Sequence, residues 1–316
     1  MRCVLSKIFI EQRWQCLGFS IGLCLVMALL TALLPKVLGD VHHIFDRLPF
    51  LRPLITALLG ADPGQQISGA MSQAFLWVHP TVLTLVWAHE VIYCTRTPAG
   101  EIDRGTIDFL LGLPISRTKI FIAELVGWLM SGICILLCGY IGHLLASIYH
   151  EPDMRPPLFV TAYVMVNFFA VYLAVGGFAF LVSTVSDRRG RAMGIVFAVL
   201  LSSFLINFVA QFWDPLKDND RPSVAATEVE SASNRIQKAP TSRIFKIPGT
   251  AELVESQSDS GGTSLAMFSV MHYYRPAIII QQQRFPRKDF ILLICIATAC
   301  LGVAAICLRR RRICTL

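Results

Sequence analysis

Long apolar runs separated by short polar connections dominate this 316-residue chain. A helix that crosses the hydrocarbon core of a bilayer needs about 20 mostly apolar residues. Six stretches meet this requirement, near residues 17–34, 75–94, 120–148, 158–185, 192–212 and 290–308. Alternating barrel strands are excluded because the runs are too long and continuous. The pattern therefore predicts an all-α membrane protein with six transmembrane helices.

Composition agrees with this prediction. Hydrophobic residues make up 54% of the chain and charged residues 16%, and the mean hydropathy is +0.59, which excludes an ordinary soluble globule. All ten cysteines fall in predicted spans or at the span ends on the basic side, so we expect no disulfide framework. Cys134 and Cys138 lie one helical turn apart, and we interpret them as apolar helix residues rather than metal ligands.

Lysine and arginine in the short connections predict the orientation, because they are concentrated on the cytoplasmic side of a membrane protein. One side carries Arg2, Lys7, Arg13, Arg96, Arg104, Arg117, Lys119, Arg188, Arg189, Arg191 and Arg309 to Arg312. The other carries only Lys36, Arg47, Arg52 and Arg155 in its short loops. Both termini are therefore predicted to be cytoplasmic. The net charge of +7 needs no nucleic-acid partner, since most of the excess faces anionic headgroups.

The first 14 residues mix apolar side chains with Lys7, Glu11 and Arg13, and Trp14 follows them. This pattern predicts an amphipathic helix in the cytoplasmic interface. A cleaved signal peptide is the competing interpretation, but the following apolar run is long enough to span the bilayer. We therefore expect residues 1–14 to remain as an interfacial helix.

The connection between the second and third spans is too apolar for a solvated loop. Ile102, Thr106, Phe109 and Leu113 recur at helical spacing, and Pro114 ends the expected helix. A cytosolic helix with such a surface is typical of a docking site for another protein. The alternative is that the segment folds back on its own membrane domain.

Residues 213–289 are predicted to form an external loop before the last span. Within it, residues 217–262 are rich in Ser, Asp, Glu, Pro and Gly, so they are expected to form a disordered insertion. Aromatic and apolar residues return after Ser264, and they predict short helices in the outer leaflet that are interrupted by Pro276.

Catalytic motifs are mostly absent. The chain has no G-x-x-x-x-G-K-[ST] loop, so we expect it to bind no ATP by itself. His89 and Glu90 could begin a zinc site of the H-E-x-x-H type, but Tyr93 stands at the second histidine position. No G-x-S-x-G motif is present either. We therefore predict a protein that is not an enzyme and holds no metal.

Polar residues within or near the spans are candidates for a transport path. They are Glu124, His143, Asn167 and Asn207. Such groups tend to face protein or water rather than lipid. The alternative is hydrogen bonding between helices, and for Glu124 a pair with Arg117 or Lys119.

Three segments together resemble the ABC-2-type permeases of ABC transporters. AGEIDRGTIDFLLGLPISRTKIFIAELVG, from Ala99, resembles the family's first cytoplasmic loop and third span. GFAFLVSTVSDRRGRAMGIVFAVLL, from Gly177, resembles the fourth and fifth spans, and SVMHYYRP, from Ser269, resembles the segment before the last span. The similarity covers nearly the whole chain except residues 217–262. Ala123 and Glu124 stand where the family often has Gly and Lys, which reverses the charge at that point.

This resemblance implies a single transmembrane domain over residues 1–316, with a cytoplasmic coupling helix in residues 101–116. It implies that the chain forms the membrane half of an exporter in the inner or plasma membrane, paired with a second permease copy or a homologous permease. A separate cytosolic ATPase would bind the ATP and Mg. The residues that the resemblance assigns to ATPase coupling are Glu101, Arg104, Gly105, Thr106, Phe109, Leu110, Leu111, Pro114 and Arg117.

Two other function classes remain open on the residues alone. An autonomous carrier driven by an ion gradient would need an ionisable group inside the bilayer, such as His143. A membrane scaffold would anchor a cytosolic partner through the same apolar loop and transport nothing. The substrate is not indicated by any residue pattern.

Overall fold

The computed structural model describes residues 2–39, 69–112, 114–150, 155, 157–219 and 269–311. In these ranges all regular structure is helical, and six helices are long and apolar enough to cross a membrane. They are α1 (Arg2–Gly39), the pair α4 (Gly69–Val78) and α5 (Pro80–Cys94), α8 (Arg117–Ser147), α9 (Leu158–Val185), α10 (Arg189–Asn219) and α14 (Arg287–Arg310). The predicted all-α membrane fold is confirmed.

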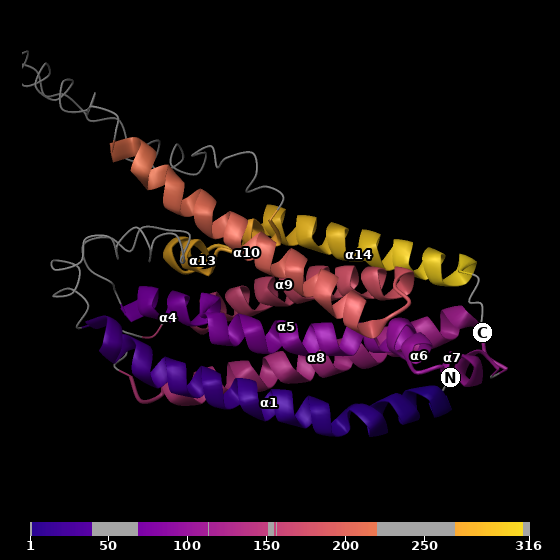
Figure 1. Ribbon diagram of the computed structural model, residues 1–316. Coiled ribbons are helices and arrows are strands. Elements are labelled where there is room, and N and C mark those ends of the chain that lie inside the picture. Colours follow the sequence, from indigo (N-terminus) through magenta and orange to yellow (C-terminus); the bar gives the residue numbers. More distant parts are fainter. Residues whose placement is uncertain are drawn as a thin grey trace, which may run out of the picture.

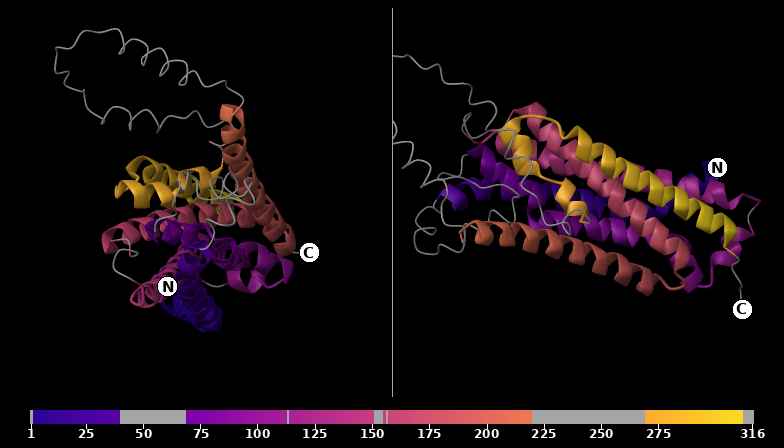
Figure 2. Two further views of the ribbon diagram at one scale, coloured as in Figure 1. Left: turned by 90° about the vertical axis from the view of Figure 1, so that its left-hand side faces the viewer. Right: turned by 90° about the horizontal axis from the view of Figure 1, so that it is seen from above.

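The helices form one elongated bundle (Figure 1). Helix α1 runs beside α8, and α14 runs beside α9, while α5 lies between these pairs and contacts both α1 and α9. Helix α10 packs on α9 and α5 and diverges from the other helices along its length (Figures 1 and 2). The start of α1 and the end of α14 lie at the same end of the bundle, which we call the terminal end.

Local sequence explains where the helices begin. Ser116 caps α8, because its hydroxyl accepts the backbone N–H of Lys119. The second span is divided into α4 and α5 at His79 and Pro80, since a proline can occupy the first turn of a helix but disfavours helical geometry in the residue before it. His79 accepts the N–H of Thr81 and so caps the new helix.

The N-terminal helix that the amphipathic pattern predicts is present, and it continues directly into the first span as α1. The segment between Trp14 and Leu17 contains Gln15 and Cys16 and no Gly or Pro, so no residue there ends a helix. Ile10 and Trp14 are exposed, whereas Ile8 and Gln12 are buried against the bundle. Helix α1 therefore combines the predicted interfacial segment and the first span in one continuous helix.

Two short helices precede the last span: η5 (Val270–Tyr273) and α13 (Pro276–Gln282). They agree with the short helices that the sequence predicts around Pro276, which stands in the first turn of α13. Helix α13 packs on α4 and α9 at the end opposite the terminal end (Figure 1). The predicted insertion over residues 217–262 lies outside the described residues, apart from the last three residues of α10.

Candidate functional site

The connection from α5 to α8 lies at the terminal end of the bundle (Figure 1). It begins with a π-helical turn, Arg96–Gly100, in which Thr97 has extended backbone angles and precedes a cis peptide bond to Pro98. Two short helices follow, α6 (Glu101–Asp103) and α7 (Ile107–Leu111). The candidate coupling residues therefore lie in one compact loop.

The sequence pattern predicts one helix through this loop, but Gly105 divides it into α6 and α7. Gly105 has a φ of 69°, a left-handed conformation that glycine adopts without steric cost. Thr106 stabilises the turn between the two helices. Its N–H donates to the Glu101 carbonyl at 2.9 Å, and its hydroxyl donates to the Glu101 carboxylate. Hydrophobic spacing predicts the helical content of this loop but carries no information about this backbone turn.

The short helix α7 exposes a large apolar side chain. Phe109 is 81% exposed, whereas Ile107 on the same helix is only 4% exposed and faces the protein. The side chains of Leu110 and Leu111, and all of Leu113, lie outside the described residues. Arg104, Gly105 and Pro114 are exposed, and Arg117 begins α8. The loop thus presents Phe109 outward from a segment held by Ile107.

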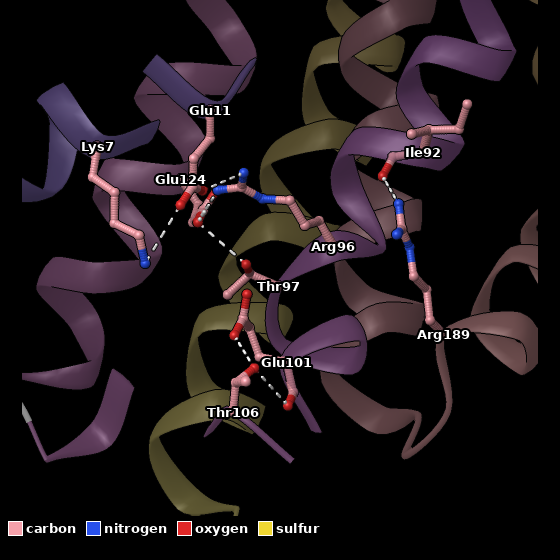
Figure 3. Close-up of polar contacts among 9 residues, drawn as sticks. All are labelled: Lys7, Glu11, Ile92, Arg96, Thr97, Glu101, Thr106, Glu124 and Arg189. Atoms are coloured by element: carbon pink, nitrogen blue, oxygen red, sulfur yellow. Dashed lines mark hydrogen bonds and ion pairs between the residues drawn. The ribbon is translucent and has the colours of Figure 1, made fainter. Parts of the chain in front are cut away.

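Arg96 links the start of the loop to two spans (Figure 3). Its guanidinium contacts the Glu11 carboxylate on α1 at 2.9 Å and the Glu124 carboxylate on α8 at 3.0 Å. The Thr97 hydroxyl donates to the same oxygen of Glu124 at 3.2 Å. We call these four residues the Arg96 clasp. The expected pair of Glu124 with Arg117 or Lys119 is not formed; Arg117 instead donates to the Arg311 carbonyl at 2.6 Å.

The clasp is largely removed from solvent. The side chain of Arg96 is 13% exposed and that of Glu124 is 8% exposed, whereas Glu11 is 44% exposed and also contacts Lys7 at 3.6 Å. Burial lowers the pKa of Arg96, but its contacts with Glu124, together with Tyr93 and Glu11, raise it by more, so this pKa lies above its ordinary value. A charged guanidinium between two carboxylates is therefore the stable form.

Two further arginines tie helix ends together at the terminal end. Arg189, at the start of α10, donates to the carbonyl of Ile92 on α5 at 2.9 Å (Figure 3). Arg311, after α14, donates to the carbonyls of Thr184 and Ser186 and forms an ion pair with Asp187. The basic residues that predict orientation thus also hold the ends of the helices in place.

The four residues predicted for a transport path lie at different interfaces. Glu124 belongs to the clasp, and His143 on α8 hydrogen-bonds the Thr31 hydroxyl on α1 at 2.9 Å. Asn167 on α9 donates to the Tyr273 carbonyl at 3.4 Å, and Asn207 is half-buried on α10. His143 and the amide nitrogen of Asn167 thus take part in hydrogen bonds between segments, whereas the buried side-chain oxygen of Asn167 has no partner among the described residues. A role for these residues in transport stays a prediction.

Sequence reasoning missed a buried polar group where α5, α8 and α9 meet. Glu90 is fully buried on α5 and lies beside the backbone of Gly176 on α9. The neighbouring His89 ring contacts the Ser131 hydroxyl on α8 at 3.2 Å. A carboxylic acid inside an otherwise apolar run was a usable signal. In the sequence, Glu90 belongs to no motif other than an incomplete zinc-binding pattern.

The sequence does not identify Arg96 and Glu11 as site residues, because they belong to separate segments and only the fold brings them into contact. The sequence pattern shows Arg96 only as one of the charges that set orientation, and Glu11 only as part of an amphipathic face. Nothing in the spacing along the chain indicates that they meet, since 85 positions separate them.

The six apolar helices define a multi-pass membrane protein whose loop between the second and third spans is built at the terminal end. A family model described as "ABC-2 family transporter protein" matches residues 91–308, well over half of the chain. The chain therefore belongs to the ABC-2 transporter family, which confirms the resemblance found in the sequence. No significant match was found among curated proteins or among solved structures.

Proposed function

We propose that this chain is the permease subunit of an ATP-driven exporter and that α6 and α7 dock a separate cytosolic ATPase. The observation that carries the proposal is Phe109, an aromatic side chain 81% exposed on a short helix at the end of the bundle. Aromatic residues are enriched at protein–protein interfaces, so an exposed phenylalanine outside the lipid is a candidate anchor for a partner protein. Membership of the ABC-2 transporter family supports a transport role.

The terminal end is the cytoplasmic end in this proposal. This end carries Arg96, Arg104, Arg117, Arg188 and Arg311, in agreement with the positive-inside rule. The ATPase chains bind ATP and Mg, and this chain binds neither. A second permease copy, or a homologous permease, completes the export path in the inner or plasma membrane.

Replacing Phe109 by Asp tests the docking surface. Burying a phenylalanine contributes about 1.5 to 3 kcal/mol, and a carboxylate in its place adds a desolvation cost. Each 1.4 kcal/mol changes a dissociation constant about tenfold. Binding of the partner ABC ATPase should therefore weaken by more than roughly tenfold, measured on purified permease in detergent or nanodiscs.

Tyr149→Asp is the matched control, because Tyr149 is also a highly exposed aromatic residue and lies at the other end of α8. It should bind the ATPase like the parent. Parental binding by Phe109→Asp would contradict the docking assignment. Transport in vesicles without any ATPase would favour the autonomous carrier, and ATPase binding without transport would favour the scaffold.

A further inference from the structure

We call the connection between α5 and α8, residues 95–116, the docking loop. The Arg96 clasp joins this loop to two spans that are distant in sequence. Arg96 and Thr97 form the first turn of the loop, Glu11 lies on α1 and Glu124 on α8 (Figure 3). The loop also ends on α8, at the Ser116 cap. Both ends of the docking loop are therefore attached to the same helix, within its first two turns.

This double attachment limits how the loop can move. Arg96 and Thr97 donate to the same oxygen of Glu124, at 3.0 and 3.2 Å, and the ion pair is shielded from water. Salt screens buried ion pairs much less than exposed ones. The Arg96–Glu124 pair is therefore the stronger of the two ion pairs in the clasp, and the Arg96–Glu11 pair is the weaker. A displacement of α6 and α7 would carry α8 along rather than be absorbed in the loop.

The contact with α1 differs in kind. Glu11 is 44% exposed, and it already has a second cation within reach, since Lys7 lies 3.6 Å away on the same helix. If Arg96 moved away, Glu11 would keep an ion-pair partner, so this half of the clasp can open without leaving a buried charge. By contrast, Arg189 binds a backbone carbonyl, which offers no comparable exchange of partners.

We propose that the Arg96 clasp transmits movement of the docking loop to the spans: the loop stays attached to α8 through Glu124, while the Arg96–Glu11 contact with α1 opens and closes. Arg96, Glu124 and Glu11 are positioning residues in this scheme and do not touch the ATPase. The inference rests on the proposed function, since it needs an ATPase on the loop. It adds that docking and transmission depend on different residues.

The test compares docking with response in the reconstituted permease–ATPase complex. Two variants are used, Arg96→Gln and Glu124→Gln; the second retains an amide oxygen that can accept from Arg96 and Thr97. Each should bind the ATPase within about twofold of the parent. The change in ATP hydrolysis that the permease causes should fall by more than about fivefold. A third variant, Glu11→Gln, removes only the ion pair with α1 and should lower the same response by more than about twofold.

Arg13→Gln is the matched control, because it removes an exposed arginine from α1 near Glu11 and should leave both quantities unchanged. Parental response in Arg96→Gln and Glu124→Gln would overturn the proposal. Parental response in Glu11→Gln would overturn it as well, since the contact with α1 would then take no part in transmission. Loss of binding in both variants would assign the clasp to docking instead. Failure of the proposed function has a separate signature, parental binding by Phe109→Asp.

Discussion

At the scale of single residues, glycine sets how closely α8 approaches its neighbours. A Cβ added at Gly142 would lie 2.3 Å from the carbonyl oxygen of Cys24 on α1, which is backbone and cannot turn aside. On the facing helix α9, a Cβ at Gly176 would lie 2.0 Å from the Trp128 ring. No hydrophobic force drives helices together within lipid, so their association depends on close van der Waals packing. Small residues at such crossings allow this close packing.

We predict that Gly142→Ala destabilises the bundle. The added methyl would force α1 and α8 apart, and overpacking of this kind costs about 1 to 3 kcal/mol. Gly18→Ala on α1 is the control, since no atom lies within 4 Å of its added Cβ, and the better helix propensity of alanine should leave stability unchanged or raise it by up to about 1 kcal/mol. Unfolding in detergent, followed by circular dichroism, measures both. Equal melting temperatures would contradict the close crossing.

The candidate site was only partly predictable at this scale. The sequence identifies Glu124 as an unusual charge at the start of an apolar run, because a carboxylate there needs a partner. It does not identify Arg96 as that partner, since the pairing depends on how the π-helical turn directs the side chain back to α8. Residue type indicates the need for a contact, and the fold decides which residue supplies it.

At the scale of elements, apolar run length predicts the spans well and their ends less well. The third span was expected from residue 120, but α8 begins at Arg117, because charged residues are good helix formers once Ser116 supplies a cap. The break between α6 and α7 was not expected, since it depends on the left-handed turn at Gly105. Hydropathy indicates burial in lipid, and backbone turns and caps decide the boundaries.

We predict that residues 220–262, which follow α10, are dispensable for folding. Their composition, rich in Ser, Glu, Asp and Pro, cannot bury enough apolar surface to offset the entropy of ordering. Replacing them with a short Gly-Ser bridge should preserve membrane insertion and ATPase binding, measured by expression, carbonate extraction and co-purification. A deletion protein that is degraded or fails to bind the ATPase would show that the segment contributes to the fold or to docking.

At the scale of the whole molecule, the arrangement and the charge distribution agree. The start of α1, the α6–α7 loop and the end of α14 lie at one end of the bundle, as expected for the six spans in the described part of the chain (Figure 1). The arginines of the clasp, the α9–α10 turn and the end of α14 belong to that same end. The same arginines therefore favour a cytoplasmic location for this end and connect the helices next to the α6–α7 loop.

This agreement gives the last prediction, that the terminal end faces the cytoplasm. A cysteine at Arg188, which is exposed in the α9–α10 turn, should react with a membrane-impermeant maleimide only after the cells are permeabilised. A cysteine at Ser233, which lies outside the described residues but within the predicted external segment, should react in intact cells. The parent protein, treated in the same way, controls for its native cysteines. The reverse labelling pattern would place the docking loop outside the cell, where no ATPase could reach Phe109, and would exclude the proposed coupling.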